Sequence, residues 1–176
     1  GDEEKKDGGW TLELIDPQNI CADGENWIAS EAEPGGTPGK QNSVFAEKPD
    51  LTGPHLTQAI AIDANTLVLK FNEKLEKQLR AVTNFLIQPA REISEVGFGD
   101  GTLTTLRLAL SQPLMGGVKY TITLSSVYDC PGNIISADFR QAVFSLPEEA
   151  DSLDMVINEI LFNPRPTGVD FVEVYN

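Results

Sequence analysis

Apolar and polar residues alternate in short runs along most of this 176-residue chain, and turn-forming residues separate the runs. Alternation with a period of two is typical of strands that bury one face. The pattern predicts seven central strands, at residues 59–63, 66–71, 84–88, 92–98, 103–110, 118–124 and 139–146. Short strands at a spacing of about 8–12 residues predict an all-β fold of the β-sandwich type.

The residues between these strands predict tight turns and one helix. Asp63–Asn65 and Gly99–Gly101 predict the turns of two hairpins, and Pro131–Asn133 predicts a further turn. Residues 72–82 are the helix-like stretch, because two leucines four positions apart lie on one face. We expect a helix of about two to three turns there.

Each end of the chain carries strand-like segments outside this central pattern. Residues 10–15 alternate and predict a strand. Residues 16–44 are rich in Pro, Gly and Asn and predict a long loop, which Trp27 would anchor by burying its ring. Residues 155–162 and 169–175 predict two more strands, which follow an acidic linker.

The two tail strands are too few to be stable alone, because an isolated two-stranded ribbon is marginal in water. Their unpaired edges and apolar side chains predict pairing with another strand. We expect the tail to add to the strand at 10–15, either within the chain or by strand exchange with a second copy. The linker at 147–154 is short, which favours the exchange, and light scattering would detect the resulting dimer.

Charge is distributed unevenly along the chain and narrows its possible partners. The sequence has 13 basic and 27 acidic residues, and the net charge of −14 excludes nucleic-acid binding through charge. Residues 1–44 carry −7, residues 45–147 carry −1 and residues 148–176 carry −6, which indicates three segments of different character. The longest apolar runs are far shorter than the roughly 18 residues of a membrane span. The chain begins at Gly1, so we expect any signal peptide to lie upstream.

The two ends contain motifs that resemble parts of one known domain. Val156–Pro164, followed by Asp170–Asn176, resembles the opening of a lamin-tail domain. Gly9–Asp16, followed by Asn26-Trp27 and Gly36–Gly39, resembles the closing segment of such a domain. The middle of a lamin-tail domain is absent, so the resemblance implies a partial copy at each end.

The central segment resembles the Ig-like modules of bacterial S-layer-type surface proteins. The motifs that carry this resemblance are Leu67–Glu73, Asn84-Phe85, Tyr120–Thr123 and Asp129–Asn133. The resemblance implies an Ig-like β-sandwich with flanking partial lamin-tail strands. The implied domains are a lamin-tail closing segment at 1–44, an Ig-like domain at 45–147, and a linker with a lamin-tail opening segment at 148–176.

The resemblance also implies a function outside the cell or at the bacterial cell surface. It implies a non-catalytic structural or adhesive module of an exported multidomain protein, whose partners would be neighbouring modules, a surface protein or a glycan. One alternative is an accessory region of a secreted nuclease or glycan hydrolase. Another is a carbohydrate-binding module, in which Trp10, Trp27 or Tyr128 would stack on a sugar.

No residue is predicted to be catalytic. The sequence has a single histidine, His55, and no Gly-x-Ser-x-Gly motif that would supply a nucleophile. Glu159 and Glu173 form a candidate carboxylate pair, but their positions on predicted strands favour a hydrogen-bonding role. The basic residues of the predicted helix fit its solvated face: Lys74, Lys77 and Arg80.

Metal binding has weak support in the sequence. One histidine and two cysteines cannot supply a His/Cys zinc site within one chain. Asp23–Asn26 and Asp100 are oxygen-rich like calcium loops, yet neither stretch has the bidentate glutamate that ends such a loop. We interpret both as surface turns and predict no cofactor, with calcium held between modules as the open alternative.

The two cysteines, Cys21 and Cys130, are the disulfide candidates, and both lie in predicted loops. In an exported protein, two lone cysteines tend to be oxidised together. The alternative is two unrelated thiols, one of them buried as a small apolar group. A bridge would require their Cα atoms to lie within about 7 Å of each other.

Overall fold

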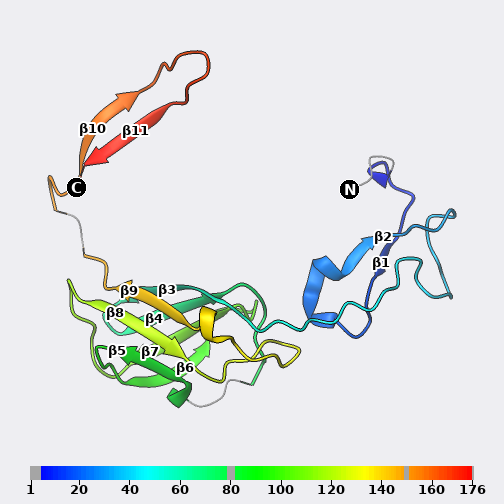
Figure 1. The fold of residues 1–176 in the computed structure, drawn as a ribbon, viewed down its shortest axis with the longest axis horizontal. Helices are drawn as coiled ribbons and strands as arrows, with labels where there is room; N and C mark the ends of the chain where they lie inside the picture. Colours follow the sequence, from blue (N-terminus) through cyan, green and yellow to red (C-terminus); the bar gives the residue numbers. More distant parts are fainter. Residues whose placement is uncertain (1–4, 79–81, 149–150, 176) are drawn as a thin grey trace.

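The computed structural model describes residues 5–78, 82–148 and 151–175, and its central part is a β-sandwich of two antiparallel sheets (Figure 1). One sheet has four strands in the order β3-β4-β7-β6, which are Leu56–Asp63, Thr66–Phe71, Thr105–Leu110 and Ile93–Phe98. The other has three strands in the order β5-β8-β9, which are Phe85–Gln88, Lys119–Leu124 and Gln141–Ser145. The predicted all-β, Ig-like sandwich is confirmed.

The alternation of apolar and polar residues places the core of the sandwich. Leu67 and Leu69 of β4 are 0% exposed, as are Leu106 and Leu108 of β7. Leu67 lies opposite Leu108, and Leu69 lies opposite Leu106, across the β4–β7 pair. The two-residue period of a strand therefore turns these four side chains to the same buried face.

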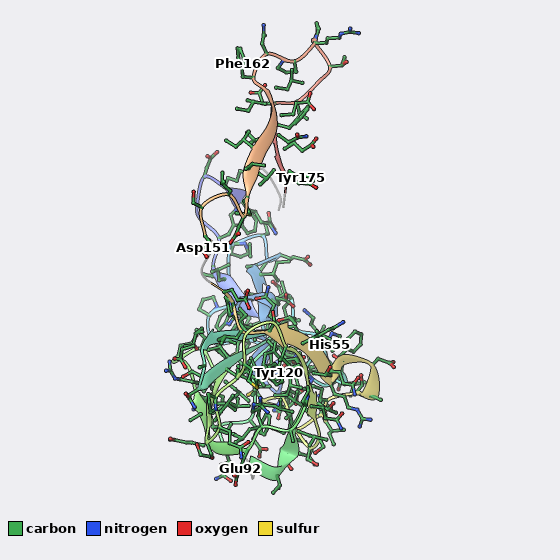
Figure 2. All side chains as sticks on the ribbon, turned by 90° about the vertical axis from the view of Figure 1, so that its left-hand side faces the viewer. His55, Glu92, Tyr120, Asp151, Phe162 and Tyr175 are labelled. Atoms are coloured by element: carbon green, nitrogen blue, oxygen red, sulfur yellow. A yellow bond between two sulfur atoms is a disulfide. The ribbon has the colours of Figure 1, made fainter. Side chains whose placement is uncertain are left out.

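Tyr120 of β8 has the largest of the fully buried side chains, and its hydroxyl is hydrogen-bonded. The hydroxyl oxygen accepts from Arg91 Nη2 at 2.8 Å and from the Met115 N–H at 3.0 Å. The ring stacks on Phe144 of β9 with centroids 5.5 Å apart, and Figure 2 shows Tyr120 inside the sandwich. A buried hydroxyl without partners would destabilise the core. These two bonds satisfy the hydroxyl and also hold the loops that carry Arg91 and Met115.

The predicted turns are confirmed. Asp63–Asn65 connects β3 to β4, and Gly99–Gly101 lies in the connection between the paired strands β6 and β7. Within Pro131–Asn133, Gly132 has a φ of 104°, a left-handed conformation that glycine adopts without a steric penalty. A short 3-10 turn, η4 (Ala137–Phe139), precedes β9.

The predicted helix at 72–82 is wrong over the residues that the structure describes. The segment after β4 is extended and irregular, and the Leu75 N–H donates to the Leu103 carbonyl at 2.9 Å. The Leu75 side chain is 1% exposed, so this leucine is inserted into the core of the sandwich from a segment that is not helical. Residues 79–81 lie outside the described residues, and Val82–Asn84 form the 3-10 turn η3. Across the described ranges, no helix is long and apolar enough to cross a membrane.

Residues 5–48, which we name the arm, fold as a small unit beside the sandwich. In the arm, β1 (Leu12–Leu14) pairs antiparallel with β2 (Trp27–Ala29), and the 3-10 segment η2 (Ile20–Asn26) lies between them in the chain. β2 falls in the predicted loop, and Trp27 is 47% exposed, so the predicted anchoring of this loop by a buried Trp27 is wrong. The buried side chains described in the arm are polar instead: Glu13, Asp16, Asn19, Asn26 and Ser30.

The C-terminal segment forms a hairpin of its own, which Figures 1 and 2 show projecting from the sandwich. β10 (Val156–Leu161) pairs antiparallel with β11 (Phe171–Tyr175), and every residue of both strands is exposed. The predicted pairing of the tail with the strand at 10–15 within the chain is wrong, because β1 pairs with β2 and β10 with β11. Closing a short loop costs less chain entropy than a return across the sandwich. Strand exchange between two copies stays a prediction.

Candidate functional site

The arm and the sandwich meet along a cleft of about 710 Å³, whose lining comes from both parts. Cys21 and Cys130 are joined by a disulfide beside this cleft, with Cα atoms 6.0 Å apart. Lys74 Nζ lies 2.6 Å from Asp23 Oδ1, which makes a second contact between the sandwich and the arm. The structure thus brings together the two candidate cysteines and positions the arm against one end of the sandwich.

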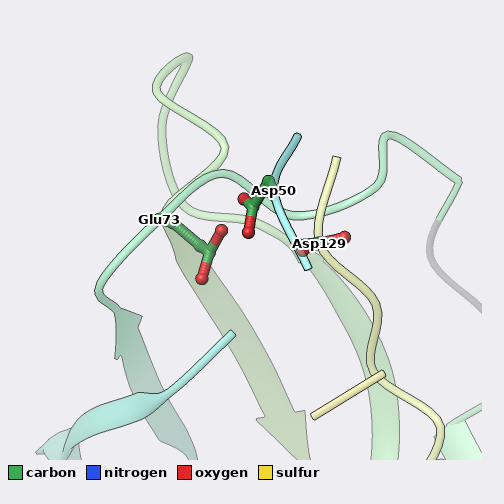
Figure 3. A group of neighbouring side chains, drawn as sticks. All are labelled: Asp50, Glu73 and Asp129. Carbon is green, nitrogen blue, oxygen red and sulfur yellow. The ribbon is translucent and has the colours of Figure 1, made fainter. Parts of the chain in front are cut away.

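Three carboxyl groups gather beside this cleft: Asp50, Glu73 and Asp129 (Figure 3). We name them the carboxyl cluster, because one oxygen from each lies within 4.8 Å of the others. Asp50 belongs to the connector at 49–55 between the arm and β3, Glu73 follows β4, and Asp129 follows β8. Asp129 is 0% exposed, and the other two are half-buried.

Asp129 is held in place by the turn that follows it. Its Oδ1 atom accepts from the Gly132 N–H at 2.7 Å and from the Asn133 N–H at 2.6 Å. Its Oδ2 atom accepts from Asn133 Nδ2 at 2.8 Å. Asn133 Nδ2 also donates to the Asp50 carbonyl at 3.1 Å, so this turn fixes the connector as well as the carboxylate. An aspartate that bonds the backbone of the next turn is a common way to order such a loop.

Glu73 has the most perturbed environment of the cluster. Burial raises the pKa of its carboxyl, and the negative charges of Asp50 and Asp129 raise it further. A hydrogen bond from Asn72 acts in the opposite direction, and the net result lifts the pKa of Glu73 from 4.5 to about 7. A negative charge on Glu73 is therefore unfavourable unless a positive charge or a proton accompanies it.

The two lysines that line the cleft are both engaged by the arm. Lys74 pairs with Asp23, and Lys48 Nζ donates to the Glu25 carbonyl at 3.1 Å. The expected placement of Lys74 on the solvated face of a helix is wrong, because its segment is not helical and its ammonium group contacts the arm. Lys77 is exposed, and Arg80 lies outside the described residues.

A second polar centre organises the arm around Glu13, whose side chain is buried at 4% exposure. Its Oε1 atom accepts from the Thr37 hydroxyl at 2.6 Å, and its Oε2 atom accepts from the Ser43 N–H and hydroxyl, each at 2.7 Å. Burial acts to raise the pKa of the Glu13 carboxyl, but these hydrogen bonds outweigh it and lower the pKa from 4.5 to about 2. One carboxylate on β1 thus ties the glycine- and proline-rich stretch to the small sheet.

We predict that acid releases this stretch of the arm. The folded pKa of Glu13 lies below its unfolded value, so its contribution to stability is present above pH 4.5 and is lost as the pH falls towards 2. The tryptophan fluorescence of the arm, from Trp10 and Trp27, should change over this interval. In Glu13→Gln the arm should already be loosened at pH 7, and the acid transition should be flattened. Identical acid titrations of the two proteins would contradict this role.

The other candidate residues of the sequence do not join the carboxyl cluster. The His55 N–H donates to Asn72 Oδ1 at 2.6 Å, and its ring stacks on Phe139 at a centroid distance of 3.6 Å. Asp100 Oδ1 accepts from the Thr102 N–H and hydroxyl, as expected of a turn. Asn26, in the first calcium-like stretch, is 1% exposed and bonds within the arm.

The paired glutamates and the aromatic candidates are spread over different elements. Glu159 and Glu173 lie opposite each other on the exposed β10–β11 hairpin, and Glu173 Oε1 accepts from Asn158 Nδ2 at 2.6 Å. Trp10 and Trp27 belong to the arm, whereas Tyr128 lies in the loop after β8. This placement keeps the two tryptophans on a different unit from the tyrosine.

The sequence pattern does not predict the carboxyl cluster. Its members come from three segments separated by more than 20 residues, and no spacing rule connects them. Asp129 belongs to the Asp129–Asn133 motif, which carries the resemblance to Ig-like modules and does not by itself indicate a cluster of carboxylates. Position is the one available signal: Glu73 follows the end of β4 and Asp129 begins a turn, and the sandwich topology brings both to the connector that carries Asp50.

No protein-family model matches the chain, and no curated protein matches its sequence. Solved structures do match. The S-layer protein rSbsC(31-844) aligns with 62% of this chain and 15% of its own, at 20% identity and a TM-score of 0.51. The N-terminal part of the bacterial S-layer protein SbsC aligns with the same share, 62%, and 26% of its own chain, at 20% identity and a TM-score of 0.52. At this identity the likeness concerns the fold, and the chain spans about a quarter or less of the structures that it matches.

Proposed function

We propose that this chain is a non-catalytic structural or adhesive module of an exported, multidomain bacterial surface protein. The observation that carries the proposal is the sandwich, which has the fold of S-layer protein domains at TM-scores of 0.51 and 0.52. A rigid sandwich with chain extensions at both ends suits a spacer that positions its neighbours (Figure 1). The disulfide supports a location outside the cell, because disulfides persist in oxidising compartments.

The proposed domains are a lamin-tail closing segment at 1–44, the Ig-like domain at 45–147, and a linker with a lamin-tail opening segment at 148–176. The arm and the tail each contribute one two-stranded sheet, β1-β2 and β10-β11, which supports this division. Both sheets expose apolar side chains, including Leu12, Ile28 and Val172. Such faces are normally covered in a complete domain, by neighbouring modules or by a partner.

The non-catalytic part of the proposal predicts background rates in esterase, phosphodiesterase and glycosidase assays of the purified chain. His55 is the natural test residue, because it is the single histidine of the sequence and its ring is stacked on Phe139. Wild-type protein and His55→Ala should be indistinguishable in all three assays. A turnover that disappears in His55→Ala would overturn the proposal.

A further inference from the structure

We propose that the carboxyl cluster binds one divalent cation of the calcium class, and that this ion fastens the connector to the sandwich beside the disulfide. The site would be formed by Asp50, Glu73 and Asp129, with Asn19 of the arm on the lining of the same cleft. It does not include the calcium-like stretches of the sequence, in which Asp23 is paired with Lys74 and Asp100 accepts from Thr102.

The donor atoms suit a hard cation. One oxygen from each of the three carboxylates lies within 4.8 Å of the others, a spacing that allows all three to contact one ion. Calcium takes six to eight oxygen ligands at about 2.3–2.6 Å in flexible geometry, and carboxylates and backbone carbonyls supply them. The cluster contains neither a histidine nor a thiolate, so its chemistry does not favour zinc or copper.

An independent observation points to a ligand in the cleft. Asn19 is 8% exposed and lines the cleft together with Asp50 and Glu73. Its Nδ2 atom donates to the Lys48 carbonyl at 2.7 Å, which fixes the amide two residues before Asp50. Its Oδ1 atom is buried and has no hydrogen-bond partner among the described residues. Since a buried acceptor without a partner is costly, this oxygen fits a cation or a cation-bound water in the cleft.

The charges around the cluster also favour the binding of a cation. Lys48 and Lys74 line the cleft, but their ammonium groups are directed to the Glu25 carbonyl and to the Asp23 carboxylate. Three carboxylates held this closely repel one another, and a divalent ion between them replaces that repulsion with attraction. The structure therefore fixes the negative groups while the nearby lysines serve a different contact.

The consequence of binding follows from where the ligands lie. Asp50 is on the connector, and Asp129 is adjacent to Cys130, to which the arm is bonded. At Asp50 the connector is already held by a hydrogen bond from Asn133 Nδ2 to the Asp50 carbonyl. A cation shared by Asp50 and Asp129 would fasten the connector at a second point and stiffen the joint between the arm and the sandwich.

Isothermal titration calorimetry of the full chain with CaCl2 at constant ionic strength tests the proposal. We expect one ion per chain with a Kd of about 0.1–1 mM, the range of extracellular calcium modules. Calcium at 10 mM should raise the melting temperature by about 3–10 °C relative to EDTA. Glu73→Gln and Asp50→Asn should each weaken binding at least about tenfold, whereas Glu95→Gln, which removes one exposed charge on β6, should bind as wild type does.

The stability of the variants distinguishes a cation site from a purely structural cluster. In EDTA, Glu73→Gln should melt at or above the wild-type temperature, because it relieves repulsion, and calcium should no longer raise it. Asp129 is left unchanged, because it also holds the turn at Gly132 and Asn133. The proposal is overturned if no saturable binding is seen, if Glu95→Gln weakens binding as much as Glu73→Gln, or if Glu73→Gln retains the full calcium response.

Discussion

Replacing Cys21 and Cys130 together with serine is expected to lower the free energy of unfolding by about 4–5 kcal/mol. The two cysteines are 109 positions apart, and a bridge across so long a loop removes much of the conformational freedom of the unfolded chain. The loss should be concentrated in the arm, whose described buried side chains are polar and supply little hydrophobic stabilisation. Urea denaturation followed by tryptophan fluorescence measures it, because both tryptophans lie in the arm.

Wild-type protein in a reducing buffer is the matched control for this variant, since it loses the bridge without a substitution. It should denature at the same urea concentration as Cys21→Ser/Cys130→Ser. Alkylation of the untreated protein before intact-mass analysis should detect no free thiol. Superimposable urea curves with and without reductant would show that the bridge does not stabilise the chain.

Leu67→Ala should destabilise the sandwich by about 2–5 kcal/mol. Leu67 is 0% exposed and lies opposite Leu108 in the centre of the four-stranded sheet, so truncation leaves a cavity that rigid neighbouring strands cannot fill. Far-ultraviolet circular dichroism during urea denaturation reports the loss, because the sandwich contains most of the strands.

Leu86→Ala provides the matched control within the same sandwich. Leu86 lies on β5 and is 56% exposed, so the same truncation should change the free energy of unfolding by less than about 0.5 kcal/mol. Equal effects of the two substitutions would contradict the assignment of the core to the inward faces of β4 and β7.

The sandwich could be predicted from the sequence because its signals are local. A two-residue period sets the buried face of β4 and β7, and Asp63–Asn65 and Gly99–Gly101 mark where strands reverse. The prediction of a helix at 72–82 is wrong because Leu75 is buried by contact with distant parts of the chain. The periodicity within the segment does not encode such contacts. Tertiary contacts overrode the local pattern there.

Sequence patterns do not predict the structure of the arm or the carboxyl cluster, and the two reasons differ. β2 is three residues long, and the arm is organised by Glu13, whose partners Thr37 and Ser43 lie 24 and 30 positions away. Hydrophobic periodicity contains no information about such a polar interior. The cluster depends on which strand ends and turns the topology brings together, and the residue pattern within one segment does not encode that.

The Cys21–Cys130 bridge also determines which part of the chain would bear mechanical load. Tension applied upstream of Cys21 and downstream of Cys130 would pass through the sulfur–sulfur bond and bypass everything between them. Strands β3 to β8 lie inside that closed loop, so pulling would not unravel them from end to end. At about 3.3–3.6 Å per residue, the 109-residue separation keeps roughly 360–390 Å of extension locked. Reduction of this one bond would release that length, so the reduced chain would extend further under load than the oxidised chain, in which only the segments outside the loop can be pulled out.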